Sequence, residues 1–258
     1  MFGWLFGKKK RLGALDYAVK SEVGLVRSNN EDNYFVDESR TLFCVADGMG
    51  GGAEGEVASA IVVEEVAKVV PEKPYRSRLE HFEAALETAN QRIRKIAADK
   101  GYRQMGSTAV GIIISEDRPS RAAICHVGDS RAYRLRDSKI EPLTRDHTVG
   151  GELSSMATGA KASQLKDRAN PLAHMLTRAL GATDNSLGDW KLIDLKRGDK
   201  LIICSDGVHD VITDDHLRKI MKADDEPAKI AARLEKAILK AGAPDNYTYI
   251  IINVGEVK

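Results

Sequence analysis

Phe43-Cys-Val-Ala-Asp-Gly48 and Ile202-Ile-Cys-Ser-Asp-Gly207 share one pattern, an apolar run that stops at Asp-Gly. Short apolar runs of this kind predict buried β-strands. A strand that ends on a carboxylate holds that group rigidly at the rim of a sheet, and glycine lets the backbone turn there and approach a ligand closely. Two such strand ends predict a metal site.

The composition predicts one globular domain without a strong overall charge. A chain of 258 residues, 43% of them hydrophobic, is long enough to bury a large core. The 39 lysines and arginines nearly balance the 38 aspartates and glutamates, so we expect no nucleic-acid partner. Cys44, Cys125 and Cys204 lie in apolar runs without CxxC spacing, which indicates buried, reduced thiols and a cytoplasmic location.

Residues 1–12 form a tail that combines a short apolar run, Met1-Phe-Gly-Trp-Leu-Phe6, with the basic cluster Lys8-Lys-Lys-Arg11. The apolar run is too short for a signal peptide or a membrane span. We expect a loosely packed end. Contact of this tail with a membrane surface is the alternative, because tryptophan and phenylalanine beside lysine are typical of interfacial segments. Residues 13–258 are expected to form the single domain.

Periodicity predicts an α+β fold. Apolar residues at helical spacing predict helices within 58–70, 79–96 and 230–238. Strand-like runs lie at 41–46, 108–114, 122–127, 132–135, 201–204 and 247–254. The short turns Gly128-Asp-Ser130 and Arg136-Asp-Ser-Lys139 predict hairpins and therefore antiparallel sheets. Residues 148–170 are small and polar, which is typical of a flap, and we expect that segment to influence substrate choice.

Six acidic residues adjoin glycine, asparagine or a predicted strand end: Glu31, Asp32, Asp47, Asp129, Asp206 and Asp245. Each alone is an ordinary turn residue. Together in a cleft they would repel one another unless cations bind between them. A set of oxygen ligands without His or Cys favours Mg²⁺ or Mn²⁺ over zinc. Two ions are expected, because a pair can activate water for attack on phosphorus, and Arg27 would bind the phosphate oxygens.

Eight motifs together resemble the PP2C-type (PPM) metal-dependent serine/threonine protein phosphatases in their bacterial single-domain form. In family order they are Arg27-x-x-x-Glu31-Asp32, Val45-Ala-Asp-Gly-Met-Gly-Gly51, Gly106-Ser-Thr-Ala109, Val127-Gly-Asp-Ser-Arg-Ala-Tyr-Arg134, Leu143-Thr-Arg-Asp-His147, Leu176-Thr-Arg-Ala-Leu-Gly181, Cys204-Ser-Asp-Gly207 and Asp245-Asn246. Any one of them is a weak signal, but the ordered set is highly specific.

The resemblance implies a four-layer α-β-β-α sandwich, with two antiparallel sheets between helices and the metal ions at one end of the cleft. It also implies site roles: Asp47 bridges both ions; Asp206 and Asp245 complete the first site; Glu31 and the backbone carbonyl of Gly48 belong to the second; Asp32 supports them from behind; Asp129, with Asp206, holds a third, weaker ion; Arg27 binds phosphate.

The implied activity is hydrolysis of phosphoserine and phosphothreonine by direct attack of metal-activated water. The implied partners are phosphoproteins and a cognate Hanks-type kinase with its substrates. A catalytically silent scaffold or regulatory binding protein on the same fold is one alternative, and a divalent-ion binding module without hydrolysis is another.

The chain departs from the family at the proton donor. Met49 and Gly52 stand where relatives carry a histidine that serves as general acid, and neither can donate a proton. We therefore expect the loss of the acid to lower turnover of alkyl phosphates more than that of p-nitrophenyl phosphate, whose leaving group hardly needs an acid. Elsewhere, His126 is expected to be a satisfied core residue, and His147 a structural one.

Overall fold

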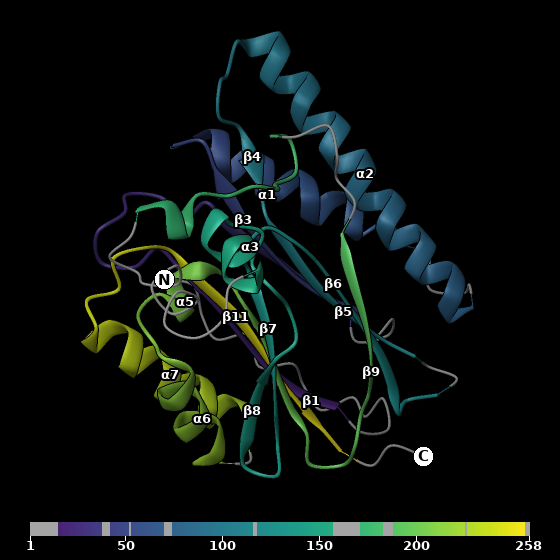
Figure 1. Ribbon diagram of the computed structural model, residues 1–258, viewed down its shortest axis with the longest axis vertical. Coiled ribbons are helices and arrows are strands. Elements are labelled where there is room, and N and C mark those ends of the chain that lie inside the picture. The colour runs from purple at the N-terminus through teal and green to yellow at the C-terminus, as the bar shows by residue number, and fades with distance from the viewer. Residues whose placement is uncertain are drawn as a thin grey trace.

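The computed structural model describes residues 15–37, 42–51, 53–69, 74–115, 118–156, 171–182, 188–224 and 226–255. These residues build two antiparallel sheets (Figure 1). In spatial order, the first sheet contains β1 (Leu15–Glu22), β11 (Tyr247–Val254), β10 (Lys200–Cys204), β7 (Arg131–Arg136) and β8 (Lys139–Pro142). The second contains β2 (Asp32–Asp37), β3 (Leu42–Met49), β5 (Ala109–Ile114), β6 (Arg121–Val127) and β9 (Asp189–Asp194), and β4 (Gly106–Ser107) pairs with the end of β3.

Helices cover the outer face of each sheet, so the four-layer α-β-β-α sandwich is confirmed (Figure 1). α1 (Ala53–Val66) and α2 (Tyr75–Lys100) pack on the second sheet, whereas α6 (Asp214–Lys222) and α7 (Pro227–Lys240) pack on the first. The short elements α3 (Val149–Met156), η2 (Pro171–His174) and α5 (Asp206–His209) lie in the connections. No helix among the described residues is both long and apolar enough to cross a membrane.

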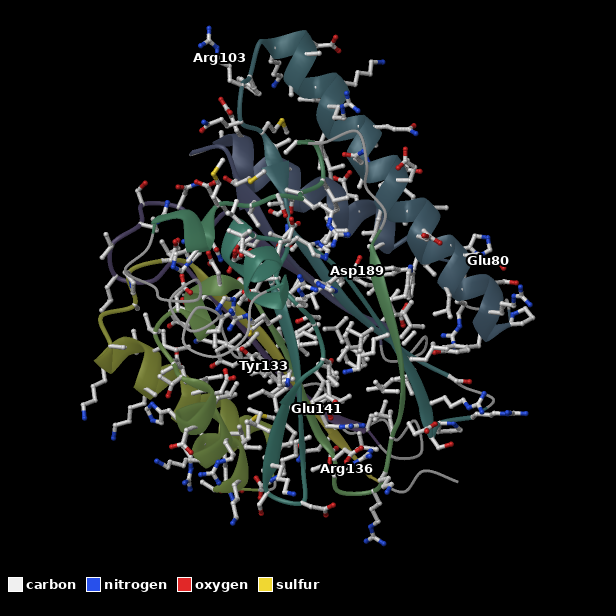
Figure 2. The ribbon with its side chains drawn as sticks, in the orientation of Figure 1. Glu80, Arg103, Tyr133, Arg136, Glu141 and Asp189 are labelled. Atoms are coloured by element: carbon white, nitrogen blue, oxygen red, sulfur yellow. The ribbon has the colours of Figure 1, made fainter. Side chains whose placement is uncertain are left out.

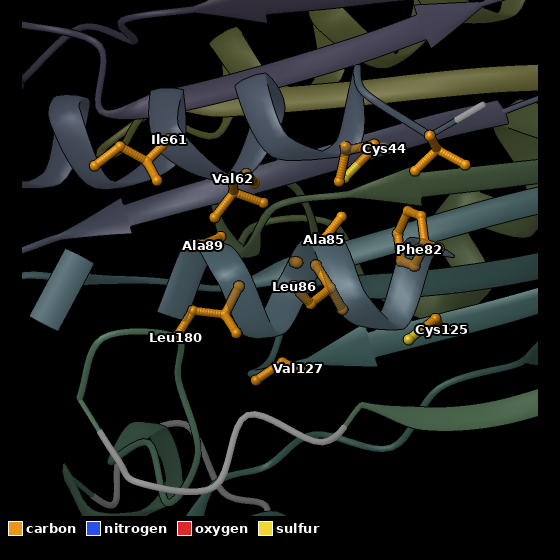
Figure 3. Packing of buried hydrophobic residues seen from close by; sticks show 14 of the residues in the cluster. Cys44, Ile61, Val62, Phe82, Ala85, Leu86, Ala89, Cys125, Val127 and Leu180 are labelled. Atoms are coloured by element: carbon orange, nitrogen blue, oxygen red, sulfur yellow. The ribbon is translucent and has the colours of Figure 1, made fainter. Parts of the chain in front are cut away.

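Three layers of buried side chains hold the sandwich together. Phe82 and Leu86 of α2 pack with Val62 of α1 over the second sheet (Figure 3). Between the sheets, Ile203 faces the central layer, while its neighbour Ile202 faces α6 and α7. Successive residues of a strand point to opposite faces, so a strand covered on both faces is a continuous apolar run.

The six predicted strands and three predicted helices are confirmed, but one predicted hairpin is wrong. Arg136-Asp-Ser-Lys139 does join β7 to β8, with φ of 49° at Asp137 and 62° at Ser138, as in a tight two-residue turn. The Gly128-Asp-Ser130 turn instead crosses from β6 in the second sheet to β7 in the first. Turn residues permit a reversal without specifying which strand follows, and this crossing carries Asp129 toward the cleft.

The predicted flap is described in part. Its first residues form α3, and residues 157–170 lie outside the described residues, as does the tail at 1–12.

Candidate metal centre

Four acidic residues lie where strands of both sheets end. Asp32 begins β2 and stands directly opposite Asp47 in the β2–β3 register. Asp206 follows β10 as the first residue of α5, and Asp245 immediately precedes Asn246 and β11. The ends of two strand pairs, one pair from each sheet, thus bring these carboxylates together at one end of the cleft.

Asp47 and Asp206 are close enough for their carboxyl groups to hydrogen-bond to one another. Burial raises the pKa of Asp47 well above its usual range, and the charges of Asp206, Asp32 and Asp129 raise it further. Burial, together with the charge of Asp206, raises the pKa of Asp32 to about 7. Carboxyl oxygens crowded in this way fit a hard divalent cation, which would favour their ionised form and remove their mutual repulsion.

In the described part of the chain, no three of these acidic side chains have ligand atoms that all lie within 4.8 Å of one another. Among the described residues, the one trio of acidic, His or Cys side chains with all ligand atoms within 4.8 Å of one another is His126, His147 and Asp189. A cluster of several carboxylates in which no three converge on one point would hold two divalent ions better than one. The donor set therefore fits a binuclear centre.

The His126–His147–Asp189 trio is itself a poor metal site. The two imidazole rings stack with centroids 4.4 Å apart and an interplanar angle of 29°, whereas a metal ion binds in the plane of each ring. Nε2 of His126 lies 2.7 Å from the carbonyl of Arg145, and the guanidinium of Arg178 donates to both oxygens of Asp189, which Figure 2 labels at the start of β9. The expectation of a satisfied His126 is confirmed.

His147 joins the Asp129 turn to the base of the flap. The Gly128 amide donates to Nδ1 of His147 at 3.1 Å, and the His147 amide donates to the Gly128 carbonyl at 3.0 Å. The carbonyl of His147 accepts from the Thr177 amide at 2.8 Å. Through its buried imidazole and its own backbone amide and carbonyl, His147 thus connects the Gly128 turn with the Thr177 segment, in keeping with its predicted structural role.

The neutral state of His147 should make folding stability depend on pH. Burial, with the positive charges of His126 and Arg178, lowers the pKa of His147 to about 4. The unfolded chain, with a histidine pKa of about 6.5, takes up the proton first, so this contribution is lost as pH falls from about 6.5 to about 4. Between pH 7 and pH 5 the loss should be about 2 kcal/mol.

Urea unfolding at both pH values checks this expectation. His147→Gln should flatten the pH dependence, while His216→Gln, at an exposed position on α6, should retain it. Equal slopes in all three proteins would contradict the assignment of the effect to His147.

Arg27 pairs with Asp245 through a 2.7 Å contact between Nη2 and Oδ2. The predicted phosphate-binding residue thus contacts a predicted metal ligand. The Arg27 side chain is 49% exposed, and ion pairs at such positions contribute only about 0–1 kcal/mol. The guanidinium can therefore leave Asp245 for a phosphate at little energetic cost.

Glu31 and Gly48 meet above Gly55 of α1. A Cβ atom at Gly55 would lie 1.9 Å from Oε2 of Glu31 and 2.8 Å from the carbonyl oxygen of Gly48, so both oxygens approach one point. The Gly48 amide also donates to the Glu31 carbonyl at 3.1 Å. The structure brings together the two groups that the family resemblance places in the second metal site.

Asp129 completes the acidic cluster beside Asp206. Burial raises its pKa well above the usual range, and the charge of Asp206 adds to this effect. Its carbonyl lies 3.1 Å from Nε2 of His209 in α5, which ties the crossing turn to the element that carries Asp206. All the predicted carboxylates therefore belong to one region.

Several supporting residues were missed by sequence reasoning. Ser205 donates its hydroxyl to Oδ2 of Asp32 at 2.7 Å, and Thr108 accepts from the Asp47 amide at 3.1 Å. The side-chain oxygen of Asn246 accepts from the Glu31 amide at 2.8 Å, across a separation of 215 residues. Ser205 and Thr108 stand inside quoted motifs and could have been suspected, whereas nothing in the sequence marks Gly55.

Comparison with known proteins finds similarity to protein phosphatases in each case that follows. A family model described as Protein phosphatase 2C matches residues 26–241. The chain is 31% identical to the serine/threonine protein phosphatase PstP of Mycobacterium tuberculosis over 93% of its own length and 45% of PstP. It is 32% identical to the protein phosphatase PhpP of Streptococcus pneumoniae, over 94% of this chain and 98% of PhpP.

A solved structure agrees with these sequence matches. The catalytic domain of PstP in complex with two manganese ions has a TM-score of 0.80 at 31% identity, covering 94% of this chain and 99% of that chain. The chain thus spans about half the length of full PstP and nearly all of PhpP.

Proposed function

The chain belongs to the protein phosphatase 2C family, and we propose on this basis that it hydrolyses phosphoserine and phosphothreonine in proteins with two bound divalent cations. The observation that carries the proposal is the buried carboxylate cluster around Asp47 and Asp206, whose pKa values are raised first by burial and then by the charges of neighbouring carboxylates. The two manganese ions reported for the catalytic domain of PstP support a metal-dependent reaction.

When bound, the ions supply an acidified water and neutralise the phosphoryl oxygens. In this proposal Asp47 would serve both ions, Asp206 and Asp245 would complete the first site, and Glu31 with the Gly48 carbonyl would belong to the second. Asp32 holds Ser205 and the strand end in place. Asp129 and Asp206 are the proposed ligands of a third ion. Arg27 orients the phosphate with its forked guanidinium.

Because residue 49 is methionine, no acid at this position can protonate the oxygen of the leaving serine or threonine. Met49 lines an irregular cavity with Met105 and Leu176, and a Cβ atom at Gly106 would lie 2.5 Å from its Cε. This side chain has no titratable atom, so water or another group of the protein must protonate the leaving serine or threonine oxygen. Substrates with good leaving groups should be hydrolysed faster than alkyl phosphates.

We further propose phosphoproteins as substrates, a cognate Hanks-type kinase as the opposing enzyme, and a single catalytic domain over residues 13–258 with a flap at 148–170. A cytoplasmic location fits the thiol chemistry. Cys44, Cys125 and Cys204 are buried and unbridged, and burial raises the pKa of Cys44 and Cys204 to about 12.

Removal of divalent cations should abolish phosphate release. The purified chain is expected to hydrolyse p-nitrophenyl phosphate and a phosphothreonine peptide with added Mn²⁺ or Mg²⁺, and to fall at least about 100-fold in EDTA. Mn²⁺ at about 100 times its dissociation constant should also stabilise the fold by about 2.7 kcal/mol, measured by thermal unfolding.

The two readouts separate the alternatives. Stabilisation by Mn²⁺ without phosphate release would identify a silent scaffold or an ion-binding module, and undiminished hydrolysis in EDTA would refute the metal-dependent mechanism.

A further inference from the structure

Leu25 and Val26 expose an apolar surface at the rim of the metal centre. Their side chains are 65% and 71% exposed, and they stand directly before Arg27. Of the large apolar residues that are exposed in the described part of the chain, they alone are neighbours in sequence. Single exposed apolar residues are common, whereas an adjacent pair beside a functional residue indicates a contact surface.

Hydrogen bonds fix the loop that carries Leu25 and Val26, so the exposure of these two side chains does not result from a flexible loop. The Asn246 side-chain amide donates to the carbonyls of Val23 at 2.8 Å and of Asn29 at 2.9 Å, one on each side of the pair. The Leu25 amide donates to the Ala243 carbonyl at 2.9 Å.

Gly24 adds a steric constraint to the same loop. Its φ is +82°, and a Cβ atom there would lie 2.2 Å from the carbonyl oxygen of Asp245. The loop is therefore preorganised with two branched side chains facing outward, and preorganisation lowers the entropy cost of binding.

The position of the pair defines its occupant. Arg27 lies 2.7 Å from Asp245, at the place where a phosphate would be bound. An extended peptide advances about 3.3–3.6 Å per residue, so a side chain that reaches Val26 or Leu25 belongs to a residue within about three positions of the phosphorylated one.

We propose that Leu25 and Val26 bind an apolar side chain of the substrate next to the phosphoserine or phosphothreonine, and so favour phosphoproteins with leucine, isoleucine, valine or phenylalanine close to the modified residue. This inference rests on the proposed phosphatase function. The metal centre binds only the phosphate, so selection for a neighbouring apolar residue would come from Leu25 and Val26.

The test compares two phosphothreonine peptides, one with leucines flanking the phosphothreonine and one with serines, in the Mn²⁺-loaded full chain. The wild-type protein should prefer the leucine peptide in kcat/KM by about tenfold, mainly through KM. Leu25→Ser/Val26→Ser should remove most of that preference. Leu192→Ser, at a 72% exposed position on the edge strand β9, is the matched control and should keep it.

p-Nitrophenyl phosphate separates failure of the inference from failure of the function. If the wild-type protein hydrolyses this small substrate but does not discriminate between the peptides, the inference is overturned while the function stands. An equal loss on both peptides in the double variant would also overturn it. A wild-type protein that is dimeric, with a monomeric double variant, would also overturn the inference, because a second copy of the chain would then cover Leu25 and Val26.

Discussion

Asp47→Asn is expected to reduce hydrolysis of p-nitrophenyl phosphate by at least about 1,000-fold and, at the same time, to raise the melting temperature of the metal-free protein. Loss of the central anionic ligand removes the ions, and about 4 kcal/mol of lost transition-state stabilisation corresponds to this rate. In the metal-free protein, Asp47 is buried against the charges of Asp206, Asp32 and Asp129, so a neutral side chain relieves repulsion.

Steady-state kinetics with Mn²⁺ and thermal unfolding in EDTA measure the two effects. The control is Asp215→Asn, an aspartate on the exposed face of α6 that pairs with Arg218 and Lys219. It should leave turnover unchanged. A variant of Asp47 that keeps its activity would remove the proposed bridging role, and a lower melting temperature in EDTA would contradict the account of crowded charges.

Gly207→Ala should have the second large effect, a loss of about 3 kcal/mol in the free energy of unfolding and at least about 100-fold in activity. A Cβ atom at Gly207 would lie 1.9 Å from the backbone oxygen of Asn246 and 3.5 Å from Cβ of Asp245. The backbone oxygen cannot rotate away, so the segment that carries Asp245 must shift.

Gly198→Ala provides the contrast. Its φ of +87° disfavours alanine, yet a Cβ atom there would meet open space, so only about 1 kcal/mol should be lost and activity should remain. Urea unfolding and kcat/KM on p-nitrophenyl phosphate measure both variants. Full activity in Gly207→Ala would show that the close packing behind the second Asp-Gly stretch is not needed for the site.

Apart from the two-residue strand β4, the strands that sequence patterns did not predict are β1, β2, β8 and β9, and each is an edge of its sheet. Central strands are covered on both faces and are therefore continuous apolar runs, as in β10, where all five residues are buried. An edge strand such as β9 has mixed burial, with Leu192 exposed and Ile193 buried. An edge strand has a neighbouring strand on one side only, so fewer of its side chains are buried and its sequence shows a weaker apolar pattern.

The candidate site was predictable where carboxylates follow apolar runs and unpredictable where distant segments support them. Asp47 and Asp206 are marked by their Asp-Gly strand ends. The approach of Glu31 to Gly55 depends on how α1 packs against the second sheet, which no local pattern encodes. The wrong hairpin at Gly128-Asp-Ser130 has the same origin, because sheet membership is a property of the tertiary fold.

The amide of Asn246 also determines when the protein can first become active. It donates to the carbonyl of Val23 across a separation of 223 residues, and β11, which follows it, lies between β1 and β10 in the interior of the first sheet. During synthesis, the growing polypeptide carries most of its acidic ligands long before residues 245–254 leave the ribosome. Until then β1 lacks its partner strand β11 and the site lacks Asp245, so the nascent chain cannot dephosphorylate anything in its surroundings.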